Sequence, residues 1–225
     1  MIVRGCVALG SHNHIGAFSS LGDPPQDTKH DPAKPGRLVI GDNNQVREYC
    51  SLHSSTSYTD GFTSIGNNNY FMDYTHVAHD CRIGSNNTFA NNSSMGGHVR
   101  IGNNTVLGAF AKLAQFTQVG SLCMLGAASA VYSDVPSYWL ISGDRARAYG
   151  INRVGMRRVG LGREQIANLQ KAFHLVYRPG PLDERRAVII EQCSPGAEID
   201  ELLASLTNLR KGLIPVKRRN KPAGE

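Results

Sequence analysis

Apolar side chains recur at every sixth position along the first 131 residues of the chain. Gly or Ala follows ten of the last twelve of these positions, as a tight chain corner requires. A six-residue period matches neither an α-helix nor simple strand alternation. It predicts a three-sided coil of 18 residues whose inward side chains stack on one another. The repeated positions are Val3, Leu9, Ile15, Leu21, Ile40, Val46, Leu52, Ile65, Phe71, Val77, Ile83, Phe89, Met95, Ile101, Leu107, Leu113, Val119, Leu125 and Val131.

Two breaks in this register predict loops at residues 22–39 and 53–64. Asparagine-rich segments at residues 66–69, 84–87 and 102–104 suit the corners of the coil, because Asn tolerates left-handed backbone angles. We therefore predict a mainly β fold with a parallel β-helix over residues 1–144. The hand of the coil does not follow from the pattern.

The pattern changes after Pro136. Apolar residues fall at helical spacing from Ile166 to Val176 and again from Ile199 to Leu209, which predicts two or three helices within residues 163–212. Residues 145–225 are thus expected to form a small helical C-terminal domain. The polar tail from Lys217 onward is expected to fray.

Positive charge is concentrated in this C-terminal part. Residues 1–144 hold 8 Lys and Arg against 10 Asp and Glu, whereas residues 145–225 hold 16 against 8, so the formal charges are −2 and +8. No helix-turn-helix spacing, zinc finger or aromatic stacking motif accompanies the basic helices, which argues against nucleic acid. An acidic protein or a phosphorylated ligand is the expected partner.

Composition excludes several other classes. Hydrophobic residues make up 40% and charged residues 19% of the chain, which does not fit a disordered charged protein. No apolar run approaches the roughly 20 residues of a membrane span, and Met1–Arg4 opens no secretory signal. We expect a cytoplasmic protein without stable membrane insertion. The five cysteines lack a CxxC pair, which argues against a disulfide framework and a cysteine zinc site.

Histidines gather on one ladder of the coil. Residues 18 apart stack on the same face, which places His79, Gly97 and Gln115 above one another. Two further imidazoles, His76 and His98, and the carboxylate of Asp80 lie beside that ladder.

An imidazole with a pKa near neutrality is a natural general base. Asp80 could fix the tautomer of His79, provided that a chain corner turns both side chains the same way. The N–H of Gly97 could receive a developing oxyanion. A merely structural histidine cluster is the alternative interpretation of the same residues.

The sequence around this ladder resembles a known family. Asp73–Cys81 reads DYTHVAHDC, and Ala90-Asn91-Asn92 and Gly96-Gly97-His98-Val99 follow it. This combination resembles the signature of the bacterial acyl-carrier-protein:UDP-N-acetylglucosamine O-acyltransferases of lipid A synthesis, which are hexapeptide-repeat left-handed β-helices. The similarity covers essentially the whole chain, including Gln26–Lys29, Gln115-Phe116, Asp134–Pro136, Tyr149–Asn152, Arg157-Arg158 and Tyr177-Arg178.

The resemblance implies a reaction and a set of roles. A (3R)-3-hydroxyacyl chain would move from acyl carrier protein to the 3-hydroxyl of UDP-N-acetylglucosamine, with His79 as general base, Asp80 in support and the Gly97 N–H as oxyanion donor. By the same match, Asp27, Lys29, His76 and Gln115 would contact the UDP-sugar, whereas His98, Asn152 and Arg158 would line a shared cleft. The resemblance also implies a homotrimer with that cleft between neighbouring columns. The carrier thioester would be the donor substrate, with no cofactor and no metal.

The chain departs from the family at several positions. Histidine is expected where Ala114 and Arg145 stand, an acid at Val154, and an arginine at Val159. We therefore expect a weakened hold on the sugar nucleotide, or another UDP-amino sugar as acceptor. The small residue Ala127 matches the position that limits acyl-chain length. Relative to the family the first coils are lacking, so a fragment, a misplaced start and a shortened homologue all stay open.

Other functions stay open as well. A zinc enzyme of the γ-class carbonic anhydrase type could use His76, His79 and His98 as ligands. A noncatalytic relative would also fit the departures at Ala114 and Val154. Among the binding residues, Lys29 could be a solvated loop lysine, Asn152 a helix N-cap and Arg158 part of the basic face.

Overall fold

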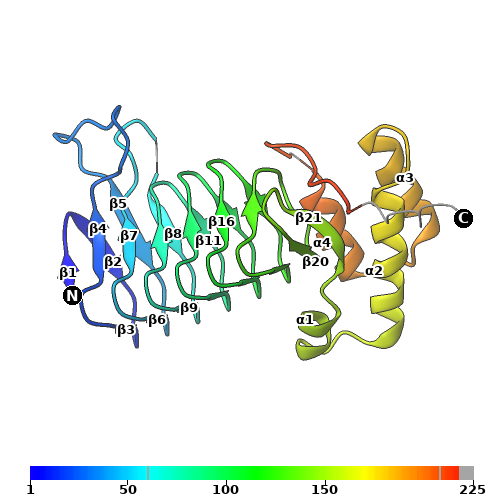
Figure 1. The fold of residues 1–225 in the computed structure, drawn as a ribbon, viewed down its shortest axis with the longest axis horizontal. Coiled ribbons are helices and arrows are strands. Elements are labelled where there is room, and N and C mark those ends of the chain that lie inside the picture. The colour runs from blue at the N-terminus through cyan, green and yellow to red at the C-terminus, as the bar shows by residue number, and fades with distance from the viewer. Residues whose placement is uncertain (60, 208, 218–225) are drawn as a thin grey trace, which may run out of the picture.

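Nineteen short strands, one for each apolar position of the six-residue repeat, wind around a three-sided column (Figure 1). The computed structural model describes residues 1–59, 61–207 and 209–217. The N-terminus lies at one end of the column, and the helices of the described residues lie at the other end (Figure 1). The fold is a left-handed parallel β-helix followed by a helical part, as the sequence and the family resemblance predict.

Each face of the column is one sheet. The first face runs β1 (Ile2–Val3), β4 (Ser20–Asp23), β7 (Ser51–His53), β10 (His76–Val77), β13 (Ser94–Met95), β16 (Lys112–Leu113) and β19 (Ala130–Val131). The second runs β2 (Cys6–Leu9), β5 (Arg37–Ile40), β8 (Thr63–Ile65), β11 (Arg82–Ile83), β14 (Arg100–Ile101) and β17 (Gln118–Val119). The third runs β3 (His14–Ile15), β6 (Gln45–Val46), β9 (Tyr70–Phe71), β12 (Thr88–Phe89), β15 (Val106–Leu107) and β18 (Met124–Leu125), and then β20 (Trp139–Ser142) and β21 (Arg147–Ile151).

The strand register confirms the 18-residue coil. Val77 pairs with Met95, and Met95 pairs with Leu113 on the next strand. All three side chains are buried. Because every coil repeats this step, residues 18 apart in sequence become vertical neighbours.

Asparagines shape the column in two ways. The predicted corner residues Asn68, Asn86 and Asn104 have φ values of 57°, 61° and 57°, the left-handed conformation that Asn adopts at low cost. The last asparagines of two of these segments, Asn69 and Asn87, point inward instead. The buried amides of Asn69 and Asn87 each donate a 3.0 Å hydrogen bond to a glycine carbonyl of the next coil, which satisfies backbone acceptors at the turns.

Two loops project from the same side of the column (Figure 1). They comprise residues 24–36, between β4 and β5, and residues 54–62, between β7 and β8. Both are shorter than expected, because β4, β5, β7 and β8 extend beyond the two residues of most strands. The loops contact one another: the Asp31 N–H donates to Ser57 Oγ over 2.8 Å, and the Ser57 N–H donates to His30 Nδ1 over 3.2 Å.

Helices follow the column. They are α1 (Arg153–Arg158), α2 (Arg163–Val176), α3 (Leu182–Gln192) and α4 (Ala197–Ser205). The last three match the expected helices of residues 163–212, whereas the six-residue α1 is too short to show a period. The hairpin of β20 and β21 spans the expected domain boundary at residues 144 and 145.

A shared core joins the two parts. Trp139 of β20 is fully buried against Phe173 of α2. Its indole N–H donates to Tyr177 Oη over 3.1 Å, and that hydroxyl donates to the carbonyl of Ile214. The column and helices therefore form one packed unit. Of the polar tail expected from Lys217, residues 218–225 lie outside the described part.

The remaining sequence expectations concern thiols and membranes. All five cysteines are free, and all except Cys6 are buried. No helix within the described residues is both long and apolar enough to cross a membrane.

Candidate active site

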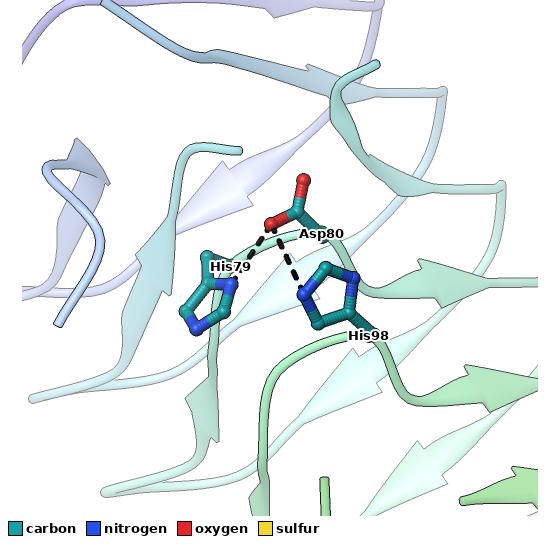
Figure 2. A group of neighbouring side chains, drawn as sticks. All are labelled: His79, Asp80 and His98. Atoms are coloured by element: carbon teal, nitrogen blue, oxygen red, sulfur yellow. Dashed lines mark hydrogen bonds and ion pairs between the residues drawn. The ribbon is translucent and has the colours of Figure 1, made fainter. Parts of the chain in front are cut away.

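The site forms where a corner of the column follows β10. His79 and Asp80 are sequence neighbours, and Asp80 takes a left-handed conformation with φ of 60°. This corner turns both side chains toward one another, as the sequence analysis required. The Nδ1 atom of His79 lies 2.8 Å from Asp80 Oδ2, and both residues are buried (Figure 2).

The loop of residues 54–62 surrounds Asp80 with donors. Thr59 Oγ1 donates to Oδ1 over 2.6 Å, Thr56 Oγ1 donates to Oδ2 over 2.8 Å, and the Thr56 N–H also points at the carboxylate. Burial would raise the pKa of Asp80, but the hydrogen bonds from His79, Thr59 and Thr56 outweigh it and hold that pKa below its usual value. An ionised carboxylate only accepts. His79 therefore donates from Nδ1, which leaves the lone pair on Nε2.

A second carboxylate faces the free nitrogen of His79. Asp27 Oδ2 lies 4.0 Å from His79 Nε2. Asp27 accepts from Tyr58 Oη over 2.5 Å and from the Lys29 N–H over 2.8 Å. The hydrogen bond from Tyr58, followed by that from the Lys29 N–H, lowers the pKa of Asp27. The Lys29 residue itself is exposed, so its backbone rather than its ammonium group is what organises Asp27.

Gly97 and His98 complete the coil next to His79. A Cβ atom on Gly97 would overlap the His79 ring atoms Cε1 and Nε2, so the close approach of the imidazole requires glycine there. Within the described chain, the Gly97 N–H donates to no acceptor. His98 Nε2 lies 3.7 Å from the same Asp80 Oδ2 atom that His79 contacts, and the His98 ring meets that of His79 edge-on with centroids 5.2 Å apart (Figure 2). The His98 ring stacks on Phe116 with centroids 4.6 Å apart.

His76 belongs to a neighbouring pair that the sequence analysis missed in part. Its ring meets His53 edge-on with centroids 4.9 Å apart, and its Nδ1 lies 2.7 Å from Ser51 Oγ. Burial, reinforced by His53 and His79, lowers the pKa of His76 to about 4. His53 is 7% exposed, and its Nδ1 has no partner within the described chain. His53 lies one coil below His76, and this position could have revealed the pair from the sequence. The six-residue repeat is interrupted from residue 53 onward, however, so the alignment of the two histidines was hidden.

Gln115 lies one coil beyond Gly97, directly before Phe116, whose N–H donates to the Gly97 carbonyl over 2.9 Å. Gln115 is exposed, and so is Ala127 on a later coil of the column. Asn152 is the N-cap of α1: its Oδ1 accepts from the Gly155 N–H over 3.0 Å, and its Nδ2 donates to the Leu122 carbonyl over 2.9 Å. Arg158 is exposed at the end of α1. Leu122 stands on the corner that carries Asn86 and Asn104, whereas His79 borders the corner of Asp80 and His98. Within a single copy of the chain, therefore, Asn152 and Arg158 do not lie beside His79.

The four residues that depart from the family pattern also lie outside the hydrogen-bonded cluster around His79. Val154 and Val159 of the α1 region are 58% and 45% exposed, and Arg145 is exposed as well. Ala114 is half-buried directly before Gln115. None of the four contributes to the hydrogen bonds around His79 and Asp80.

The described residues bring together a different metal-competent group from the one considered above. His79, Asp80 and His98 offer ligand atoms that all lie within 4.8 Å of one another. His76 is not part of this group, so the three-histidine set of the zinc alternative is not assembled. The absence of a metal requirement stays a prediction.

Comparison with known proteins identifies the family. Residues 134–214 match "Udp N-acetylglucosamine O-acyltransferase; Domain 2", and residues 62–97 match the bacterial transferase hexapeptide repeat. The acyl-[acyl-carrier-protein]–UDP-N-acetylglucosamine O-acyltransferase of Psychrobacter cryohalolentis is 52% identical over 92% of this chain and 80% of its own length, and that of Halorhodospira halophila is 38% identical over 94% and 82%. The crystal structure of UDP-N-acetylglucosamine O-acyltransferase from Moraxella catarrhalis superposes with a TM-score of 0.89 at 38% identity, covering 93% of this chain and 81% of the other. The chain therefore belongs to the acyl-carrier-protein:UDP-N-acetylglucosamine O-acyltransferase family.

Proposed function

We propose that this protein transfers a (3R)-3-hydroxyacyl chain from the thioester of acyl carrier protein to the 3-hydroxyl of UDP-N-acetylglucosamine, the first step of lipid A biosynthesis. One observation carries the proposal: an ionised Asp80 holds His79 with its Nε2 lone pair free, next to Gly97, in a chain similar to enzymes of that name over 94% of its length.

The reaction needs only a proton carrier and an oxyanion donor. His79 Nε2 takes the proton of the sugar 3-hydroxyl as its oxygen attacks the thioester carbonyl. Asp80 stabilises the imidazolium that forms, and the Gly97 N–H donates to the carbonyl oxygen as it becomes negative. The tetrahedral intermediate then collapses, the C–S bond breaks, and the thiolate of the carrier takes the proton from His79. No cofactor enters the sequence.

Substrate binding divides between two regions. Asp27, His76 and His98 lie around the base and suit the sugar. The exposed Lys29 is on the same loop as Asp27, and the exposed Gln115 is on the coil that follows Gly97. Asn152 and Arg158, next to another corner, suit the nucleotide and the acyl arm. Binding energy from these nonreacting groups would position the reacting atoms.

This division supports a homotrimer. Because Asn152 binds the Leu122 carbonyl at a different corner of the column from that of His79, a cleft between neighbouring columns would bring the α1 region of one copy, with Arg158, toward His79 of the next. Three copies around an axis would close the arrangement. We also propose a cytoplasmic location, where acyl carrier protein and the sugar nucleotide are available.

A turnover assay tests the function. The protein is mixed with 3-hydroxyacyl carrier protein and UDP-N-acetylglucosamine, and release of the carrier thiol is followed. We expect turnover in the parent and a loss of about 10²–10⁴-fold in His79→Ala, the usual contribution of a general base. His79→Gln keeps the volume of the buried side chain, so an equal loss there separates chemistry from packing. No turnover in the parent would favour a noncatalytic relative, and activity of His79→Ala within threefold of the parent would refute the assignment.

A further inference from the structure

One short loop carries hydrogen-bond donors for both carboxylates beside the base. Within residues 54–62, Thr56 and Thr59 donate to Asp80, and Tyr58 donates to Asp27. The two threonines hold the carboxylate that fixes the His79 tautomer. Tyr58 acts on the opposite side of the imidazole, where the acceptor sugar must enter.

Tyr58 is held in place mainly by its polar contact. Its Oη lies 2.5 Å from Asp27 Oδ2, although the residue is 52% exposed. Little of the ring is therefore fixed by packing. The adjacent Ser57 bonds to His30 and Asp31, so the backbone around Tyr58 is already tied to the loop that carries Asp27. The hydroxyl closes this connection at the carboxylate itself.

The geometry at Asp27 suits a pair of neighbouring sugar hydroxyls. A carboxylate offers about four acceptor sites, of which Tyr58 and the Lys29 N–H occupy two. Asp27 Oδ2 lies 4.0 Å from His79 Nε2. Adjacent hydroxyls of one sugar ring could then donate one to His79 and the other to Asp27. Rotation of the Asp27 carboxylate would destroy this match.

We propose that Tyr58 is a positioning residue for the acceptor sugar, because its hydroxyl holds the Asp27 carboxylate beside His79. The inference rests on the proposed function and goes beyond it by assigning acceptor recognition to the loop of residues 54–62. Tyr58 touches no reacting atom. It acts through Asp27, so its loss affects sugar binding more than the chemical step.

The test replaces Tyr58 by Phe, which removes the hydroxyl and keeps the ring. With acyl carrier protein saturating, we expect the KM for UDP-N-acetylglucosamine to rise about 5- to 30-fold while kcat stays within threefold. Tyr49→Phe is the matched control, because Tyr49 is 47% exposed and its hydroxyl makes no hydrogen bond within the described residues. We expect both constants to be unchanged there.

A pH profile adds a second readout. The charged and titratable groups that act on Asp27 are Tyr58, Lys29 and His79, and the Tyr58 hydrogen bond lowers the Asp27 pKa most. In Tyr58→Phe that pKa rises, so the carboxylate is protonated, and kcat/KM is lost, at a higher pH than in the parent. If Tyr58 had only a structural role, the variant would have a lower melting temperature, but the pH at which kcat/KM falls would be the same as in the parent.

Some outcomes overturn the proposal. An unchanged KM in Tyr58→Phe, an equal effect in Tyr49→Phe, or a loss confined to kcat would each do so. Calorimetric binding of UDP-N-acetylglucosamine to both proteins separates this inference from the proposed function. If the parent binds the nucleotide without turnover, the proposed function fails while the ratio of the two Kd values still decides for or against Tyr58. A parent that does not bind the nucleotide overturns both.

Discussion

The corner at His79 and the region around α1 differ in whether a single copy of the chain already buries and hydrogen-bonds the polar groups of the site. At the corner, His79 is 5% exposed and Asp80 is 9% exposed, and each carboxylate oxygen of Asp80 and Asp27 accepts a hydrogen bond. Around α1 the side chains are exposed, as at Arg157, Arg158, Val154 and Val159. The amide oxygen of Asn152 already accepts the hydrogen bond that caps the helix.

This difference separates two tasks of one enzyme. His79 and Asp80, to which we assign the proton transfer, are held by hydrogen bonds before any substrate arrives, as preorganised catalysis requires. Arg157 and Arg158, assigned to the nucleotide and the carrier, are long exposed side chains, whose ordering costs free energy when a ligand binds. Changes at the corner should therefore affect kcat strongly, and changes around α1 should affect KM and association.

After the loss of His79 itself, the largest effect is expected from Gly97→Ala. The added methyl would overlap the His79 ring and displace Nε2 from its working position, and a displacement of about 1 Å costs on the order of 10²-fold in rate. The measurement is kcat for acyl transfer together with the melting temperature. Gly162→Ala is the control, because the nearest atom to its added Cβ is Gln165 Oε1 at 3.6 Å. A kcat within threefold of the parent would contradict the close packing of base and glycine.

The sequence predicts the scaffold of the corner better than its surroundings. The six-residue period determines which residues face inward, and an 18-residue step follows from it, so the coil neighbours Val77 and Met95 are foreseeable. The turn at Asp80 was also foreseeable, because no straight strand lets His79 and Asp80 meet. Family resemblance pointed to Asp27.

Periodicity could not predict the donors from the second loop. Thr56, Tyr58 and Thr59 reach carboxylates 21 to 31 residues away in sequence, and loop residues follow no repeat that would reveal such contacts. His53 was hidden for the same reason, since the register breaks there. Periodicity did not predict α1, because six residues are too few for a helical period; only the interpretation of Asn152 as a helix N-cap, which the structure confirms, pointed to a helix there.

A smaller effect should appear when polar groups replace Ala114 on the column and Val154 in α1. Ala114→His together with Val154→Glu restores residues that the family resemblance leads us to expect. A new hydrogen bond or ion pair to a bound ligand contributes about 1–3 kcal/mol, so the KM for UDP-N-acetylglucosamine should fall about tenfold or more in the double variant, with kcat little changed. Ile190→Glu is the control for the added charge, because Ile190 is 65% exposed on α3. If the double variant gains nothing over Ile190→Glu, these positions do not contact the acceptor.

The smallest effect concerns the charge of the helical part. Residues 145–225 carry a formal charge of +8, and Arg157 and Arg158 are both exposed. Acyl carrier proteins are acidic, so this charge should speed their encounter with the enzyme. We expect Arg157→Glu with Arg158→Glu to lower kcat/KM for the acyl carrier protein about 3- to 10-fold at low salt, and the deficit to shrink as salt shortens the Debye length toward 8 Å near 0.15 M.

Arg157→Lys with Arg158→Lys keeps the charge and should associate like the parent. If the lysine pair is as impaired as the glutamate pair, the two arginines act through shaped hydrogen bonds and not through long-range attraction. A deficit that salt does not change would exclude steering as its cause.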